Sequence, residues 1–157
     1  MMTEIEQNKK GLFMKTYKEI ATNFKTIFNS LTTKGEAYIE LENEEDPLSE
    51  GVDIKVKITT NKYLDIRSLS GGEKTLAALS FIFAIQEYTP ASFYLLDEVD
   101  AALDKQNSEK LSQLIAQYSK KAQYIVVSHN DQIISEANQV YGVSMQDGIS
   151  KVVSLKV

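Results

Sequence analysis

Apolar side chains recur every three or four positions between residues 13 and 31, which is the spacing of a helix with one buried face. The polar segment 4–10 precedes this stripe, so we expect a single helix whose first part projects beyond the core. Charged side chains of the region fall off the stripe, and its apolar members are Phe13, Tyr17, Ile20, Phe24, Ile27, Phe28 and Leu31.

Polarity alternates in the next two segments. Residues 37–42 and 52–58 place apolar and polar side chains on opposite faces, which predicts two half-exposed strands. The acidic loop 43–51 joins them, and we expect antiparallel pairing. A short piece at 63–66 then leads to a glycine-containing turn.

The second half of the chain alternates helices and strands. Residues 73–88 are nearly all apolar, which predicts a helix buried on most faces. Apolar runs at 93–96 and 124–127 predict buried strands of a covered parallel sheet, with an amphipathic helix at 106–118 between them. Asp147-Gly148 is a hairpin signal near the end. This order predicts an α/β fold with a parallel sheet, flanking helices and antiparallel strands at both ends.

Composition limits the possible functions. The 157 residues suffice for one sizeable core, and the net charge of −5 argues against binding nucleic acid by bulk electrostatics. The absence of cysteine excludes a disulfide framework and a thiolate metal site, and favours an intracellular location. No run is apolar enough to span a bilayer, and the polar start is not a signal peptide.

The turn Ser70-Gly71-Gly72-Glu73 precedes the apolar helix. Free backbone N–H groups and the positive end of the helix dipole meet there, beside the Ser70 hydroxyl, and together they form a phosphate-sized anion site. Many loops contain Gly-Gly before a helix, so the turn is not sufficient by itself. The motifs that follow it in order make the functional interpretation stronger.

Asp97 and Glu98 end a predicted buried strand. Ligands of open α/β sheets collect at the carboxyl ends of strands, where Asp97 would suit Mg²⁺ held through its waters. Glu98 would orient or deprotonate an attacking water. The plain alternative is a strand end with solvated acids. The preceding glycine turn favours the functional interpretation.

His129 is the single histidine and follows the other predicted buried strand. A lone histidine is more often a surface or core residue, but an imidazole at a strand end would be able to bind a γ-phosphate or the attacking water. Asp104 has a plain alternative as the N-cap of the following helix, and it serves both roles if it also contacts a ligand.

Four motifs together resemble the signature motif, Walker B strand, D-loop and switch histidine of ATP-binding-cassette ATPases, namely Leu69–Lys74, Phe93–Glu98, Ala102-Leu103-Asp104 and His129. Within that superfamily the chain is similar to the C-terminal head lobe of structural maintenance of chromosomes (SMC) proteins. The longer runs 69–79, 83–85, 90–104, 141–145 and 148–155 carry this resemblance. Cassette transporters and zinc-hook repair ATPases usually have proline where this chain has Val99.

The resemblance implies a divided ATPase head, because nothing in the sequence matches the phosphate loop G-x-x-x-x-G-K-[ST]. SMC proteins carry that loop in an N-terminal lobe. Residues 1–34 would then be the end of a coiled-coil arm and 35–157 the C-terminal lobe, inactive alone. The implied cofactors are ATP and Mg²⁺. The implied roles are Mg²⁺ binding by Asp97, catalysis by Glu98 and His129, and nucleotide contacts by Ser70, Gly71, Gly72, Glu73 and Asp104.

The implied partners are the N-terminal SMC lobe, a second SMC head joined through shared ATP, the C-terminal winged-helix domain of a kleisin, and DNA. We expect a cytoplasmic, chromosome-associated protein acting in chromosome condensation, segregation or cohesion, with no membrane partner. One alternative is an idle lobe that docks a kleisin or DNA, and another is a DNA-repair ATPase lobe. Intact Ser70, Glu98 and His129 argue against the first, and the run 99–104 argues against the second.

Overall fold

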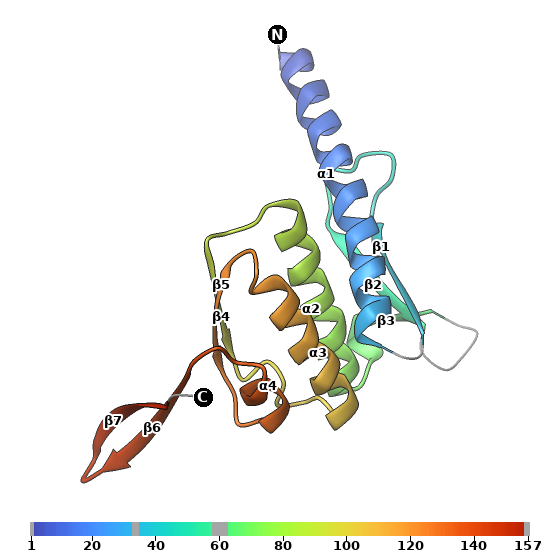
Figure 1. The fold of residues 1–157 in the computed structure, drawn as a ribbon. Helices are drawn as coiled ribbons and strands as arrows, with labels where there is room; N and C mark the ends of the chain where they lie inside the picture. The colour runs from blue at the N-terminus through green and yellow to red at the C-terminus, as the bar shows by residue number, and fades with distance from the viewer. Residues whose placement is uncertain (1, 33–34, 58–62, 156–157) are drawn as a thin grey trace.

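The computed structural model describes residues 2–32, 35–57 and 63–155. A long helix, α1 (Met2–Leu31), runs along one side of the molecule, and its N-terminal part extends beyond the rest of the chain (Figure 1). Ile5 and Leu12 in this part are 63% and 65% exposed. The helix and its projecting start are confirmed, while residues 1 and 33–34 of the expected arm lie outside the described residues. The buried side chains of α1 are Phe24, Ile27, Phe28 and Leu31.

A three-stranded antiparallel sheet lies beside α1 and contains β1 (Glu36–Leu41), β2 (Val52–Lys57) and β3 (Leu64–Asp65). The pairing of β1 with β2 confirms the prediction. Alternation places Ala37, Ile39 and Val56 in the core shared with α1, because these apolar side chains lie on the same sheet face. Ile58, at the end of the second predicted strand, lies outside the described residues.

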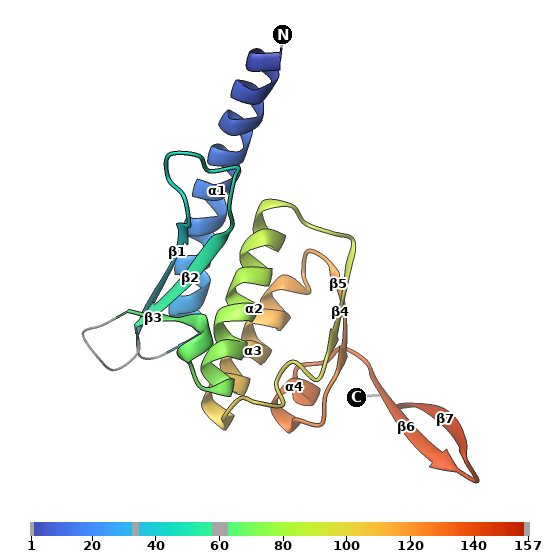
Figure 2. The ribbon, with the colours of Figure 1, turned by 180° about the vertical axis from the view of Figure 1, so that it is seen from behind.

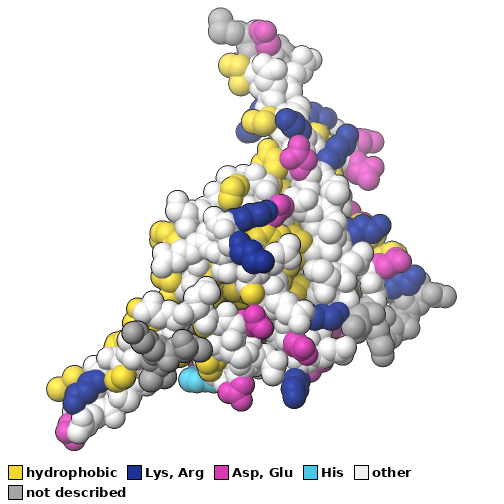
Figure 3. Space-filling view, viewed as in Figure 1, with side chains coloured by type: hydrophobic (Ala, Val, Ile, Leu, Met, Phe, Trp, Pro, Cys, Tyr) yellow, Lys and Arg dark blue, Asp and Glu magenta, His cyan; other side chains and the backbone are white. Residues whose placement is uncertain are grey.

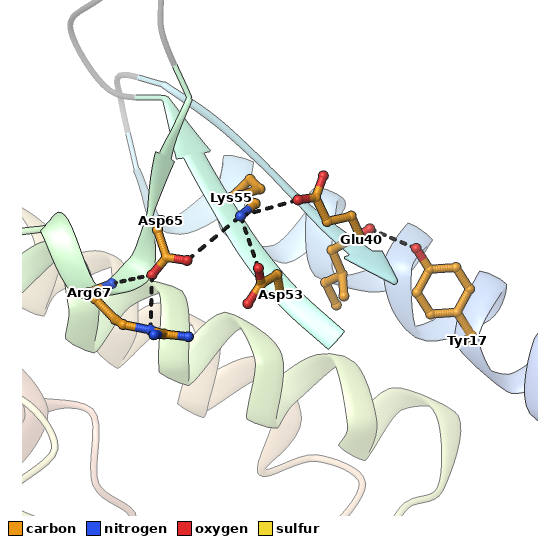
Figure 4. Close-up of polar contacts among 7 residues, drawn as sticks. Tyr17, Glu40, Asp53, Lys55, Asp65 and Arg67 are labelled. Carbon is orange, nitrogen blue, oxygen red and sulfur yellow. Dashed lines mark hydrogen bonds and ion pairs between the residues drawn. The ribbon is translucent and has the colours of Figure 1, made fainter. Parts of the chain in front are cut away.

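The opposite face of this sheet is polar and is organised by Lys55 (Figure 4). Its ammonium group lies 3.0 Å from Asp53, 3.2 Å from Glu40 and 3.7 Å from Asp65. Hydrogen bonds to Asp53 and Glu40 raise the pKa of Lys55 above its ordinary value. The sheet is also joined to α1 through the Tyr17 hydroxyl, which donates to the Ile39 carbonyl oxygen at 2.8 Å.

A 3₁₀ turn, η1 (Ile66–Ser68), precedes α2 (Gly71–Tyr88), which packs against α1. Figures 1 and 2 show α2 and α3 between α1 and the strands β4 and β5. The helix and its burial on most faces are confirmed, but one stripe of α2 is exposed. Ile82 and Ile85 are 47% and 40% exposed, because no described element of this chain covers that side of α2.

The central strands β4 (Phe93–Asp97) and β5 (Gln123–Val127) pair in parallel, and α3 (Lys105–Tyr118) connects them. The parallel pairing confirms the predicted α/β order. The expectation of a covered sheet is wrong, because one face is open to solvent. Alternate residues on that face are exposed by 45% to 64%, namely Phe93, Leu95, Ile125 and Val127.

The chain ends with the short helix α4 (Asp131–Ser135) and a hairpin of β6 (Val140–Gln146) and β7 (Ile149–Leu155), which projects from the body (Figure 1). Asp147 and Gly148 turn with φ values of 54° and 76°, which suits a two-residue hairpin turn. Within the described ranges the strands form three separate small sheets. The antiparallel strands therefore do not extend the parallel sheet, contrary to expectation.

Candidate nucleotide-binding and catalytic site

The glycine turn is closed by a capping box at the start of α2. The Ser70 hydroxyl accepts a hydrogen bond from the Glu73 N–H at 3.4 Å, and the Glu73 carboxylate accepts one from the Ser70 N–H at 2.8 Å. This reciprocal pair fixes where the helix begins. It also gives Glu73 a structural role that was not predicted from the sequence.

Glu73 bears directly on anion binding at this turn. Its carboxylate lies at the positive end of the α2 dipole, where a negative charge is favourable. An incoming phosphate would compete with that carboxylate for the Ser70 N–H. Gly71 leaves room for such a ligand, since a Cβ built there meets nothing within 4 Å.

Gly72 instead allows a close approach to another loop. A Cβ built on Gly72 would lie 2.9 Å from the Ala102 carbonyl oxygen. Side-chain carbons essentially never approach backbone oxygen so closely, so a larger residue would push the two segments apart. The glycine turn and the loop between β4 and α3 are therefore in direct contact.

Asp97 and Glu98 lie where β4 ends, and both are exposed. The Glu98 backbone has φ of 47°, a left-handed conformation that costs a non-glycine residue about 1 kcal/mol or more. Its N–H donates to the Val127 carbonyl oxygen at 2.9 Å, and its carbonyl oxygen accepts from the Ala101 N–H at 3.1 Å. These bonds hold the strained residue at the edge of the parallel sheet.

The structure brings Glu98 and His129 together. The His129 Nε2 atom lies 3.4 Å from Glu98 Oε1, and the two side chains are 90% and 55% exposed. Both residues border an open hollow of about 260 Å³, at the carboxyl ends of the two parallel strands. Such an edge is the expected position of a ligand in an open α/β sheet. The other residues around the hollow are Asp100, Ala101, Leu103 and Asn130.

Asp100 and Ser128 lie beside this pair, and neither was identified from the sequence as a site residue. Asp100 is 6% exposed, and its Oδ2 atom accepts a hydrogen bond from the Ser128 hydroxyl at 2.9 Å. Nothing in the local pattern shows that Asp100 points inward, because it lies in a polar loop after the strand. The polar residues on either side of His129 were the one feature of the sequence that could have indicated further site residues.

Asp104 caps α3, as the plain alternative predicted. Its Oδ1 atom accepts a hydrogen bond from the Asn107 N–H at 2.8 Å. The expected contact between Asp104 and a nucleotide stays a prediction.

The donor set fits a shared magnesium site rather than a self-sufficient one. Among the described residues, no group of three His, Cys, Asp or Glu side chains could hold a metal ion. Mg²⁺ commonly uses one or two carboxylates together with substrate phosphates and waters. An exposed Asp97 at the sheet edge meets that requirement only when a nucleotide supplies the other ligands.

Comparison with known proteins identifies the family. The sequence profile described as the RecF/RecN/SMC N terminal domain matches residues 4–151. The chain belongs to the RecF/RecN/SMC family. The chromosome partition protein Smc of Pyrococcus furiosus is 47% identical over 156 residues, which is 99% of this chain and 13% of that protein. The chain thus spans about an eighth of such SMC relatives.

Solved SMC structures share the fold. A P. furiosus Smc head domain with an extended coiled coil, bound to the C-terminal domain of ScpA, is 47% identical with a TM-score of 0.92, over 98% of this chain and 39% of that one. A chain from work on ATP-driven dimerization and DNA-stimulated activation of SMC ATPases is 45% identical with a TM-score of 0.85. That match covers 94% of this chain and 89% of the other.

These comparisons establish an SMC-type head fold without confirming the expected lobe. The description of the matching profile names an N-terminal domain, which differs from the expectation of a C-terminal lobe. The roles of the individual site residues stay predictions. Across the residues that the structure describes, no helix is both long and apolar enough to cross a membrane.

Proposed function

We propose that this chain is one half of an SMC ATPase head, the half that carries the signature turn, the Walker B strand and the switch histidine. The observation that carries the proposal is the placement of Glu98 beside His129 at the ends of two parallel strands, 3.4 Å apart. Fold and identity to SMC head domains support it. The phosphate loop would come from another part of the same protein.

The missing phosphate loop decides which half we propose. A lobe that wraps the β- and γ-phosphates needs the pattern G-x-x-x-x-G-K-[ST], and this sequence contains none. We therefore propose the C-terminal lobe for residues 35–157, although the matching profile is described as an N-terminal domain. Residues 1–34 would be the end of the coiled-coil arm, which agrees with the projecting start of α1.

Each site residue has a specific proposed role. Asp97 would hold Mg²⁺, which neutralises phosphate charge when it is bound with ATP. Glu98 would orient and deprotonate the attacking water, and His129 would hydrogen-bond the γ-phosphate or that water. Ser70, Gly71 and Gly72 would bind the γ-phosphate of ATP held by a second head, with Glu73 and Asp104 beside them. Hydrolysis would then separate the two heads.

The open face of the parallel sheet supports a missing half. Leu95 is 64% exposed and Phe93 61%, although both belong to a strand whose alternate residues enter the core. Two paired strands with a bare apolar face do not form a complete layer. We propose that the phosphate-loop half covers this face, because the matched SMC head chain is more than twice as long as the part that this chain covers.

The remaining partners follow from the relatives. The P. furiosus Smc head is bound to the C-terminal domain of ScpA, and we propose that a kleisin of this kind docks on the terminal hairpin. Figure 3 shows hydrophobic side chains beside charged ones on the projecting hairpin. On β6, Val143 is 71% and Met145 75% exposed. We also propose that the assembled protein acts on DNA in chromosome partition, as its relatives are named.

ATP hydrolysis by the two halves together tests the proposal. We expect turnover when this chain is mixed with the phosphate-loop half, and none with either part alone. Glu98→Gln should lower the rate about a hundredfold or more while the mixture still binds ATP, because only water activation is lost. ATP binding by this chain alone, or full turnover by Glu98→Gln, would contradict the assignment.

The idle docking lobe is the second candidate. It would be favoured if the two halves associate and bind ATP but never hydrolyse it, even with DNA and the kleisin domain present. The strained backbone at Glu98, with φ of 47°, argues against that outcome, because strain of this kind persists mainly at functional sites.

A further inference from the structure

A buried carboxylate lines the same hollow as Glu98 and His129. Asp100 is 6% exposed, although it belongs to the loop between β4 and α3. Burying a carboxylate is costly unless it is hydrogen-bonded. The Asp100 Oδ2 atom meets that requirement by accepting a hydrogen bond from the Ser128 hydroxyl at 2.9 Å. Asp100 thus connects the loop that follows Glu98 to the segment that carries His129.

The hydrogen bonds of Ser128 extend this connection past His129. The hydroxyl that donates to Asp100 also accepts a hydrogen bond from the Asn130 N–H at 2.9 Å. The Asn130 side chain in turn caps α4 by accepting from the Gln132 N–H at 3.0 Å. The backbone on both sides of His129 is therefore fixed to the Asp100 carboxylate.

His129 itself has little side-chain packing. Its side chain is 90% exposed, and the described contact of its imidazole is the one with Glu98. The position of the imidazole therefore depends on the backbone of 128–130. The loop that follows Glu98 is closed by two backbone hydrogen bonds. The Ala101 N–H donates to the Glu98 carbonyl oxygen at 3.1 Å, and the Leu103 N–H donates to the Asp100 carbonyl oxygen at 2.9 Å.

We propose that Asp100 is a positioning residue for His129. Through Ser128 it holds the histidine loop against the Glu98 loop, so that the two side chains keep their separation of 3.4 Å. Its effect on hydrolysis rests on the proposed function, whereas its effect on the position of His129 is a property of this chain alone. The two consequences can be measured separately.

The first experiment uses NMR of the isolated chain. His129 is the single histidine, so the chain gives one imidazole Cε1–H signal. We expect Asp100→Ala and Ser128→Ala to move this signal, because each removes the hydrogen bond between Asp100 and Ser128. Ser128→Ala should also accelerate exchange of the Asn130 N–H about fivefold or more, because that N–H loses its acceptor. Asp100→Asn and Ser128→Thr keep a partner for the bond and should retain the wild-type signal.

Asp131→Ala is the matched control. It removes an exposed carboxylate two residues from His129, outside the hydrogen bonds of Ser128. It should leave the exchange of the Asn130 N–H unchanged. An unmoved imidazole signal and unchanged exchange in Ser128→Ala would overturn the proposal, even if Asp100→Ala failed to fold.

The second experiment measures ATP hydrolysis by the chain completed with the phosphate-loop half. Asp100→Ala and Ser128→Ala should each lower kcat about tenfold or more with KM for ATP within about twofold, because a misplaced catalytic group slows the reaction without weakening nucleotide binding. The double variant should be no slower than the single ones. A raised KM with normal kcat would contradict positioning. If the wild-type mixture is inactive, the proposed function is wrong. The NMR experiment would still test whether Asp100 positions His129.

Discussion

At the scale of single residues, the two glycines of the turn before α2 have different surroundings. A Cβ on Gly71 meets nothing within 4 Å, whereas one on Gly72 would lie 2.9 Å from the Ala102 carbonyl oxygen. Gly71→Ala should stabilise the chain by about 0.5 kcal/mol, because alanine lowers the entropy of the unfolded chain. Gly72→Ala should destabilise it by about 1–3 kcal/mol through overpacking. Urea unfolding of the two variants beside the wild type measures the difference.

Gly71→Ala is the control for Gly72→Ala, because both changes add one methyl group in the first turn of the same helix. Equal effects of the two substitutions on the free energy of unfolding would show that the contact with Ala102 does not constrain the fold.

Most residues of the candidate site could be proposed from the sequence, but not the hydrogen bonds that connect them. Glu98 and His129 were predictable because each follows an apolar strand, and parallel strands bring their carboxyl ends to one edge. Asp100 and the carboxylate of Glu73 were not. Their partners, Ser128 and the Ser70 N–H, depend on the direction of side chains in loops and turns, which no periodicity reports.

At the scale of elements, Lys55 holds together the polar face of the three-stranded sheet. Its raised pKa arises from hydrogen bonds to Asp53 and Glu40. The pKa of Asp65 is lowered, first by the hydrogen bond from the Arg67 N–H and then by nearby positive charge that includes Lys55. A raised lysine pKa stabilises the fold at all pH values below about 10.4, and a lowered aspartate pKa does so above about 3.9.

Lys55→Met should therefore lower the thermal midpoint at pH 7, because Glu40, Asp53 and Asp65 would face one another without the cation that they share. Among the described residues, only Asp65 of the three has a further ion pair, with Arg67. The difference from the wild type should narrow as the pH falls below about 3.9, because the stabilisation that accompanies the lowered pKa of Asp65 is lost as that carboxyl becomes protonated. Thermal unfolding followed by circular dichroism across this range measures it. A difference that stays constant down to pH 2 would rule out the electrostatic explanation.

Lys57→Met provides the matched control. Lys57 belongs to the same strand, and its substitution removes the same charge. Its ammonium group lies 5.6 Å from the centroid of the Tyr63 ring instead of among the three carboxylates. Its effect on the thermal midpoint should be smaller and should not narrow below a pH of about 3.9, because Lys57 is not one of the cations that lower the pKa of Asp65.

At the scale of the whole molecule, the sequence predicted the order of elements but not what covers them. A continuous apolar run indicates a strand buried on both faces. The run is the same whether the element that covers the second face belongs to this chain or to another. The structure shows that α2 and α3 cover one face of β4 and β5, while Leu95 and Ile125 on the other face are 64% and 46% exposed. A burial pattern in a sequence can thus indicate a cover that the described residues of the chain do not supply.

This difference gives the last prediction. The double variant Leu95→Ser and Ile125→Ser should bind the phosphate-loop half at least about tenfold more weakly than the wild type, because burying one leucine-sized side chain is worth about 2 kcal/mol. Its own stability should change little, since both side chains are exposed in the isolated chain. Isothermal titration calorimetry with the separately produced half measures the affinity.

A second double variant, Val143→Ser and Val152→Ser, removes comparable apolar surface from the terminal hairpin, where these residues are 71% and 66% exposed. Val143 and Val152 face each other across the two strands, so the substitution alters one continuous patch. It should leave the affinity for the phosphate-loop half unchanged and weaken binding of the kleisin winged-helix domain. If the hairpin variant failed to bind the phosphate-loop half and the sheet variant bound it normally, the proposed assignment of partners to the two surfaces would be wrong. The sheet face and the hairpin are therefore distinguishable by one pair of titrations against the same two ligands.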